Sequence, residues 1–410
     1  MKPEYVYLQP KYVGKFQCDG EKCPANCCER DWKIFIDRET REKYFRAESP
    51  ERELTKYLEH DEDSGDFLLL RDEKNRCPFL TEKKLCGIQL QHGEKFLSLT
   101  CSSYPRRLFR FGEVIERSLS PTCPLAAELI LNPETRIDFE FSPVKLPKYA
   151  KGILFVGENF VPPEILPYFV EMQVTAISIL SERRLTLDKR LTVLGYYLYQ
   201  AERIFLSGEP NLSATLNKVY TSEEFFKDKV PNLISSVQFQ ILEFVQIIFP
   251  VLAELREKNC LTKGNEKYFS IVENAMSTDL DAPEKFGFND LAESYFDLRD
   301  LREIFLKNFS GSLENYLVNE FFGNVYPARV PGNFTENFGI FILSYKILEL
   351  VAVSMFALSR SDEKFRAEFL KAVYELSTDL AHNEKFSEVV TAAVRDKEIA
   401  LLMRGLLINR

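Results

Sequence analysis

The sequence predicts a predominantly helical α+β protein, in which an N-terminal cysteine-rich, metal-binding α+β domain packs on a C-terminal all-α domain. Eight of the nine cysteines occur within the first 123 residues of the 410-residue chain. The chain has only 17 glycines but 34 phenylalanines, a balance that suits a helical protein with few tight turns. A proline-rich segment over residues 143–167 separates two patterns, so we predict domains over residues 1–145 and 160–410.

Short β-prone runs indicate strands in the N-terminal domain, joined by the loops that carry the cysteines. The predicted strands cover residues 31–37, 67–70, 113–119 and 136–141. Helices are expected over residues 38–60 and 124–132.

Beyond residue 160 the apolar residues recur at helical spacing. Over residues 365–380 they repeat at steps of three and four, which predicts an amphipathic helix. A mostly apolar helix is expected over residues 233–255, with a break at Pro250. The segment 334–360 is rich enough in Phe, Ile and Leu to form a centrally buried helix.

The charge balance and the first residues bound the class of protein. The formal net charge is -9 and the pI is about 5.3, which argues against a nucleic-acid partner, because such binders present a basic face. The first residues show neither the apolar run nor the small-residue cleavage site of a signal peptide. No segment reaches the roughly 18 uncharged apolar residues of a membrane span. We therefore expect a cytoplasmic protein without a transmembrane segment.

The crowded cysteines are expected to hold metal rather than to bridge one another. Disulfide frameworks belong mainly to small secreted chains, whereas this chain, with 45% hydrophobic residues, is large enough to bury a core without them. Zinc sites usually show two pairs of closely spaced cysteines, while iron–sulfur clusters accept widely spaced thiolates. The spacing leaves zinc and iron–sulfur open, and equally one four-ligand site or two. The candidate ligands are Cys18, Cys23, Cys27, Cys28, Cys77, Cys86, Cys101 and Cys123.

Several motifs follow one another in a characteristic order. They are Cys23-x3-Cys27-Cys28 with Trp32-x-Ile34-x-Ile36-Asp37, Cys77-Pro78-Phe79-Leu80 with Leu85-Cys86-x-Ile88, Cys101-x-x-Tyr104-Pro105-Arg106, Glu116-x-Ser118-Leu119, Cys123-Pro124-x-Ala126 and Glu314-Asn315-Tyr316-Leu317-Val318-Asn319. Together they resemble the flagellin lysine N-methylase (FliB) family, with its cysteine-rich region of the CxxCxxCC zinc- or iron-chelating type. The first cysteines are here separated by four and three residues instead of two, so the ligand geometry of the shorter chelating domains does not transfer directly.

The resemblance implies a function that composition and spacing do not. It implies an enzyme that takes a methyl group from S-adenosylmethionine and transfers it to lysine ε-amino groups of flagellin. It also implies an iron–sulfur cluster of the 4Fe-4S type held by the N-terminal cysteines, with zinc as the alternative metal.

Two common sites for this methyl donor are absent from the sequence. There is no glycine-rich turn of the kind that follows a first strand and binds nucleotide cofactors. Cys23-x3-Cys27 also lacks the third thiol of the radical enzymes. The donor's amino and carboxylate groups could instead chelate an open iron, or its carboxylate could meet a guanidinium, which binds carboxylates through two parallel hydrogen bonds. Arg106, Arg107 and Arg110 lie among the cysteines and are the candidate cofactor-binding residues.

Methylation of lysine requires a neutral amine, so a nearby group must accept or relay a proton. Tyr104 and Glu116 lie between cysteines and are the candidate catalytic residues. Three other interpretations stay open at this point. The cysteines could form a purely structural metal site, the chain could be a non-enzymatic zinc- or iron-chelating module that binds a protein partner, or it could be a redox or metal sensor. Asn315, Tyr316 and Asn319 share a helix face that either lines a substrate groove or packs in the core.

Overall fold

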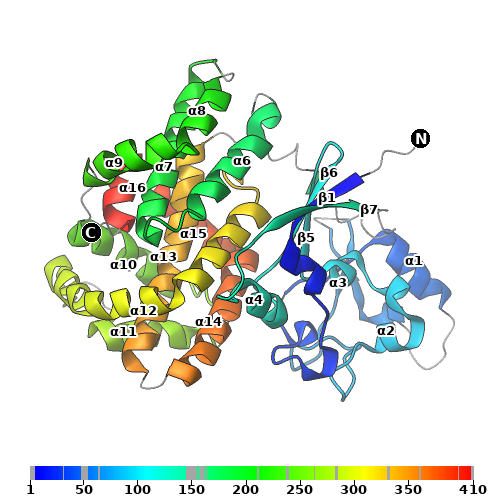
Figure 1. Ribbon diagram of the computed structural model, residues 1–410. Helices are drawn as coiled ribbons and strands as arrows, with labels where there is room; N and C mark the ends of the chain where they lie inside the picture. Colours follow the sequence, from blue (N-terminus) through cyan, green and yellow to red (C-terminus); the bar gives the residue numbers. More distant parts are fainter. Residues whose placement is uncertain are drawn as a thin grey trace. The chain divides into compact units, whose positions relative to one another are not determined.

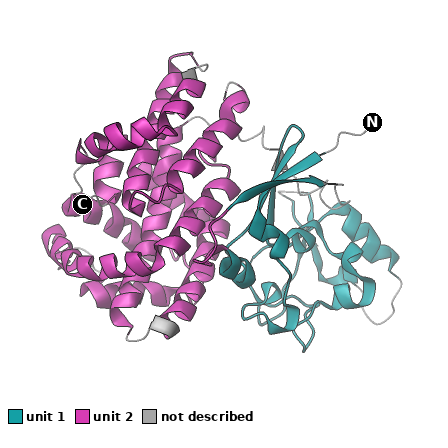
Figure 2. Cartoon of the chain, viewed as in Figure 1, with its two compact units in different colours: residues 1–129, 138–155 teal, residues 130–137, 156–410 magenta. Residues whose placement is uncertain are grey.

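The computed structural model describes most of the chain between residues 5 and 407, and the described residues form two compact units (Figure 2). Unit 1 comprises residues 1–129 and 138–155, and unit 2 comprises residues 130–137 and 156–410. Most of the proline-rich segment that we expected to be a linker lies outside the described residues. The residues not described are 1–4, 31, 48–53, 63–64, 145–154, 157–160, 162, 164, 210–211, 237–239, 263, 282–284, 330–332, 360–361, 396 and 408–410.

Unit 1 contains a five-stranded mixed sheet of order β7–β1–β6–β5–β8 (Figure 1). Strand β1 (Tyr5–Pro10) pairs in parallel with β6 (Val114–Leu119) and antiparallel with β7 (Phe139–Val144). Strand β5 (Arg106–Phe111) pairs antiparallel with β6, and β8 (Phe155–Val156) completes the order beside β5. The two ends of unit 1 thus meet in one sheet.

A second, three-stranded antiparallel sheet of order β2–β4–β3 lies in the loop-rich part of unit 1. Its strands are β2 (Phe35–Ile36), β4 (Phe67–Leu69) and β3 (Leu58–His60). Helix α1 (Arg38–Arg46) follows β2, and Asp37 caps it by accepting a hydrogen bond from the backbone of Thr40 at 3.0 Å. Unit 1 also contains the short helices α2 (Gly87–His92), α3 (Leu99–Ser103) and α4 (Pro124–Ile130).

Several predicted elements of this unit are confirmed, and others needed correction. The strands expected at 67–70, 113–119 and 136–141 correspond to β4, β6 and β7, although β7 starts three residues later than expected. The strand expected at 31–37 shrinks to the two residues of β2. The helix expected over residues 38–60 is confirmed only as α1, which ends at Arg46. Residues 54–57 form a short 3-10 helix, and residues 58–60 pair with β4 as β3.

Unit 2 is helical throughout its described residues, apart from loops and the one residue of β8 that it includes. Helix α13, expected at 334–360, and helix α14, expected around 365–380, are both confirmed. The helices of unit 2 are α6 (Leu166–Leu180), α7 (Leu187–Leu206), α8 (Leu212–Tyr220), α9 (Val230–Ser236), α10 (Ile241–Glu257), α11 (Glu266–Met276), α12 (Phe288–Gly323), α13 (Phe334–Leu358), α14 (Asp362–His382), α15 (Glu384–Val394) and α16 (Ile399–Leu406).

The prediction of one helix over 233–255 that breaks at Pro250 is wrong. The break comes earlier, because α9 ends at Ser236 and α10 begins at Ile241. Pro250 lies inside α10 at an exposed position, and the helix continues past it to Glu257. A proline removes one backbone donor, but this loss did not end the helix, whose other face is buried among apolar neighbours.

Helix α13 is the central helix of unit 2 (Figure 1). It contacts α7, α11, α12, α14, α15 and α16, and it is buried around most of its circumference. Among the described residues, α13 is the single helix that is long and apolar enough by itself to cross a membrane. The segments Phe225–Ser236 and Ile241–Glu257 meet the same length and hydropathy criteria only when they are taken together as one bent pair. In α13, 78% of the most apolar window is covered by the rest of the protein. A helix that is apolar all round and enclosed by other helices is typical of a large core.

Four buried charged side chains join α13 to its neighbours. Arg302 of α12 donates to Asp188 of α7 at 2.9 Å and to Glu349 of α13 at 2.6 Å. Lys346 of α13 lies 3.0 Å from Asp188 and 3.1 Å from Glu349. Two cations therefore alternate with two anions, and the group is neutral. Burial raises the pKa of Glu349, but Arg302 and Lys346 outweigh it and lower that pKa to about 2.

Replacing Lys346 with methionine should lower the free energy of unfolding by about 3–5 kcal/mol, because it leaves two buried carboxylates facing a single cation. Urea unfolding followed by far-UV circular dichroism measures this loss. The matched control is Lys364→Met in α14, whose exposed pair with Glu368 should contribute less than about 0.5 kcal/mol. Equal losses in both variants would show that the buried network contributes no more than a surface pair.

Candidate functional site

The eight N-terminal cysteines all lie in unit 1 as free thiols. Cys260 belongs to unit 2, where it is fully buried and its backbone N–H donates to Leu255 at 2.8 Å. It behaves as a core residue and takes no part in the site.

Two polar side chains hold the turn that contains the adjacent cysteines Cys27 and Cys28. Asn26 accepts a hydrogen bond from the backbone N–H of Cys28 at 2.9 Å and donates to the carbonyl of Lys84 at 2.7 Å. Arg71 donates to the carbonyl of Cys28 at 2.8 Å. Neither Asn26 nor Arg71 is predictable as a site residue from the sequence, because nothing in their spacing or neighbours distinguishes them from the many other polar residues.

The same turn is joined directly to Cys77. The backbone N–H of Cys77 donates to the carbonyl of Cys28 at 2.8 Å. The Cys28 side chain lies within hydrogen-bonding reach of the sulfurs of both Cys27 and Cys77. The hydrogen bond with Cys28 lowers the pKa of Cys27 to about 7 and lowers the pKa of Cys77 as well. The contact with Cys28 therefore favours the thiolate form of Cys27 and Cys77, which is the form that binds metal.

Two further thiols lie close to this trio. Cys86 precedes α2 and forms an isolated β-bridge with Leu80. Cys101 lies in α3, where its backbone N–H donates to Ser98 at 3.2 Å. Desolvation raises the pKa of Cys101 to about 12, and the sulfurs of Cys27, Cys77 and Cys86 add to the rise. We call these five residues the Cys28 group, namely Cys27, Cys28, Cys77, Cys86 and Cys101.

The remaining three thiols form a second group. Desolvation raises the pKa of Cys123 to about 11, and Cys23 and Cys18 contribute to that rise. Desolvation also raises the pKa of Cys23, with contributions from Cys18 and Cys27. We call Cys18, Cys23 and Cys123 the Cys123 group. Because Cys27 affects members of both groups, the eight thiols gather in one region of unit 1.

The donor set fits a metal that prefers soft ligands. A tetrahedral zinc ion with Zn–S bonds of about 2.3 Å draws its sulfurs to within about 4 Å of one another. Among the described residues, no three thiols have their sulfurs all within 4.8 Å of one another. Thiolate donors suit both zinc and an iron–sulfur cluster, so the donor set fits either metal group.

The predicted residue Tyr104 lies beside the thiols and joins a chain of hydroxyl groups. Its phenol shares a hydrogen bond of 3.2 Å with Thr122, and Thr122 shares one of 2.9 Å with Ser120. Arg107, another predicted residue, donates to the Ser120 hydroxyl at 3.1 Å. Burial raises the pKa of Tyr104, and the neighbouring Cys123 adds to the rise, so the phenol keeps its proton at neutral pH.

The other predicted residues divide between the two faces of the large sheet. The register pairs Arg107 with Ser118 and Phe109 with Glu116, and paired side chains share a face. Arg107 and the buried Glu116 therefore lie on one face, while Arg106 and Arg110 lie on the other. The turn between the two strands depends on Gly112, whose φ of 58° falls in the left-handed region.

The run Glu314–Asn319 in α12 contains residues with different surroundings. Glu314 accepts hydrogen bonds from Arg183 and Arg190, and Asn315 donates to the carbonyls of residues 132 and 135 at 2.9 and 2.7 Å. These contacts are core packing within unit 2. Tyr316, by contrast, lines a pocket in this unit. Asn315 therefore packs in the core, whereas the substrate-groove interpretation of this helix face stays a prediction.

Comparison with known proteins supports one family over different parts of the chain. The family model described as the FliB lysine N-methylase C-terminal domain matches residues 173–407. The flagellar biosynthetic protein FliU of Salmonella muenchen is 33% identical over 134 residues, which cover 32% of this chain and 79% of that protein. No solved structure matches.

Two proteins named Lysine-N-methylase, from Salmonella typhimurium and Salmonella choleraesuis, are also 33% identical over 134 residues. In both comparisons the match spans 33% of the length of the relative, so the shared part is a third of those proteins. The family model nevertheless covers more than half of this chain, and the match to FliU covers most of that relative. The chain belongs to the FliB lysine N-methylase family.

Proposed function

We propose that the protein is a protein-lysine N-methyltransferase that uses S-adenosylmethionine and acts on flagellin. The observation that carries this proposal is the match of residues 173–407 to the FliB lysine N-methylase C-terminal domain. The names of the relatives support the reaction, and the name of FliU, a flagellar biosynthetic protein, supports a flagellar acceptor.

The second part of the proposal is an iron–sulfur cluster of the 4Fe-4S type in unit 1. The Cys28 group and the Cys123 group offer eight thiols, which is enough for one cluster with spare thiols or for two. Zinc stays the alternative metal, because the same thiols could also hold one or two zinc ions. When bound, such a cluster would supply either a rigid staple for the loops or an iron that accepts ligands.

Within the proposed reaction, Tyr104 and Glu116 are the candidates for handling the lysine proton. A lysine must lose its proton before its nitrogen can attack a methyl group. Tyr104 has the geometry of a relay, because its phenol can pass a proton to Thr122 and from there to Ser120. Glu116 is a buried carboxylate on the same sheet face as Arg107, where it could accept a proton.

Arg106, Arg107 and Arg110 stay candidates for the carboxylate of the methyl donor. Their division between two sheet faces means that they cannot act together on one carboxylate. Arg107 is the member of this set that joins the hydroxyl chain of Tyr104, whereas Arg106 lies over the ring of Phe16, 5.3 Å from its centre.

The proposed activity should appear when anaerobically purified protein is incubated with flagellin and isotope-labelled S-adenosylmethionine. Mass spectrometry of the digested flagellin should then locate label on lysine side chains. Flagellin whose lysines have been blocked by acetylation is the control and should take up no label. Absence of transfer by protein with an intact cluster and bound donor would favour a non-enzymatic metal-chelating module.

Replacing Cys77 with serine should lower the iron and acid-labile sulfide bound per chain by at least about half, because it removes a central thiol of the Cys28 group. Metal and sulfide analysis with visible absorption measures the loss. Cys260→Ser is the matched control, since it removes a buried thiol of unit 2 and should leave both contents unchanged. Colourless wild-type protein that contains stoichiometric zinc would contradict the cluster.

The variants Tyr104→Phe and Thr122→Val should lower kcat for methyl transfer about 10- to 100-fold, since each interrupts the hydroxyl chain. The iron content and the KM for the donor should stay close to the wild-type values. Ser103→Ala is the control, because its hydroxyl bonds only locally to the carbonyl of Thr100. An unchanged kcat in both variants would remove Tyr104 from the proposed proton path.

A further inference from the structure

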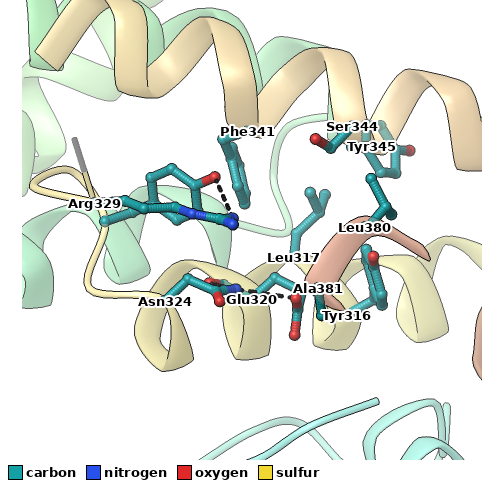
Figure 3. Close-up of a pocket in the computed structure, with 11 residues that line it drawn as sticks. Tyr316, Leu317, Glu320, Asn324, Arg329, Phe341, Ser344, Tyr345, Leu380 and Ala381 are labelled. Atoms are coloured by element: carbon teal, nitrogen blue, oxygen red, sulfur yellow. Dashed lines mark hydrogen bonds between the residues drawn. The ribbon is translucent and has the colours of Figure 1, made fainter. Parts of the chain in front are cut away.

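Unit 2 contains a pocket between α12, the segment that follows it, α13 and α14 (Figure 3). Four aromatic side chains line it, and two oppositely charged side chains, Glu320 and Arg329, are among its other lining residues. The residues on which the argument depends are Tyr316, Glu320, Asn324, Tyr326, Arg329 and Phe341.

Arg329 supplies the positive charge of this pocket. Among the described residues, its guanidinium has one hydrogen-bond partner, the phenol oxygen of Tyr326 at 3.4 Å, and no carboxylate within ion-pair distance. Figure 3 shows the guanidinium directed across the pocket toward the ring of Phe341. A half-buried guanidinium whose fork is not used by a carboxylate is suited to receive one from a ligand.

Glu320 supplies the negative charge and is held in place from two sides. Its carboxylate accepts hydrogen bonds from Asn319 and from Asn324, each at 3.0 Å. It acts on Arg329 across the pocket and helps to raise the pKa of that guanidinium, to which Tyr326 contributes most. Among the described residues Arg329 and Glu320 line one pocket without forming an ion pair with each other, an arrangement complementary to a ligand that carries both charges.

The aromatic wall is rigid and suits a cationic group near the charged pair. The lining rings of Tyr326 and Phe341 lie with their centres 5.1 Å apart. Phe321, which does not line the pocket, contacts both rings at 5.8 and 5.5 Å. Faces of such rings attract cations that are weakly hydrated, as sulfonium and quaternary ammonium groups are. Tyr345 of α13 closes the pocket on the side of the buried charges, and burial raises the pKa of its phenol.

The size of the pocket limits what it can hold. The cavity volume is about 40 Å³ and the pocket is partly open to solvent. Since each water needs roughly 10–15 Å³ by this measure, the cavity has room for about three waters. That space matches the carboxylate and ammonium of an α-amino acid, and it is too small for a complete nucleoside.

We propose that this pocket binds the zwitterionic amino-acid end of the methyl donor, with the carboxylate on Arg329 and the amino group on Glu320. The inference rests on the proposed function, because it locates the donor of that reaction in unit 2 instead of at β5. A lysine side chain fits less well, since it carries no carboxylate for the Arg329 guanidinium to bind. The donor's positive sulfonium would instead lie beside the aromatic wall.

Isothermal titration calorimetry measures binding without turnover. The protein, purified with its metal, is titrated with S-adenosylhomocysteine. Arg329→Met should weaken binding about 10- to 100-fold, because a charge-assisted, bidentate contact is lost. Arg329→Lys should recover part of the affinity, and Glu320→Gln should weaken it by a smaller factor. Arg299→Met, an exposed arginine of the same helix as Glu320, is the matched control and should bind as the wild type does.

Competition identifies which part of the ligand the pocket recognises. Methionine should displace S-adenosylhomocysteine from the wild type and lose this ability in Arg329→Met, while competition by adenosine should be the same in both. Circular dichroism checks that each variant is folded. If Arg329→Met is not folded, the affinities of Arg329→Lys and Glu320→Gln decide the test instead.

The outcomes separate this inference from the proposed function. Wild-type binding that is unchanged in Arg329→Met and Glu320→Gln but lost in Arg107→Met would overturn the inference and place the donor at β5. Wild-type protein that binds no S-adenosylhomocysteine, with its metal intact, would count against the proposed methyltransferase itself and against the pocket with it.

Discussion

The hydrogen bonds around the carbonyl and N–H of Cys28 are the constraint on which the thiol site depends. Cys27 and Cys28 are adjacent in sequence, while Cys77 is far from them, so the chain must be folded back before these sulfurs can approach. Asn26, Arg71 and the backbone of Cys77 do this through contacts of 2.7–2.9 Å that involve no sulfur atom. The thiols are therefore brought together by ordinary backbone and side-chain hydrogen bonds, which do not require a bound metal.

Unit 2 depends on a different kind of constraint, a neutral set of buried charges around a central apolar helix. Burying Lys346 or Glu349 alone would be very unfavourable, and their alternation with Arg302 and Asp188 removes most of that cost. Phe341 and Tyr345 of the same helix α13 line the pocket that contains Arg329. A network that fixes the rotation of α13 against α7 and α12 consequently fixes the pocket wall as well.

The sequence predicted elements well where one physical signal dominates. The apolar run 334–360 and the stripe around 365–380 became α13 and α14, because their burial decides their conformation. The predictions failed where hydrogen bonding to a neighbouring strand decides the conformation. Strand β5 is Arg-Arg-Leu-Phe-Arg-Phe and gave no strand signal, and residues 58–60 left the predicted helix because β4 offered them a partner. In the candidate site, the count of cysteines signalled the thiols, but Thr122 and Asn26 act through contacts that only the fold creates.

The two features that bear on function belong to different parts of the sequence. The match that defines the family covers residues 173–407 and contains the Arg329 pocket, whereas all eight clustered thiols precede that range. If the thiols were the whole of the active site, the part of the chain named for lysine methylation would have no chemical role of its own. The pocket that contains Arg329, Glu320 and several aromatic rings would give the helical unit such a role if it binds the donor as inferred. The proposed donor binding in unit 2 and the proposed metal binding in unit 1 can be tested separately, the first by ligand titration and the second by metal content.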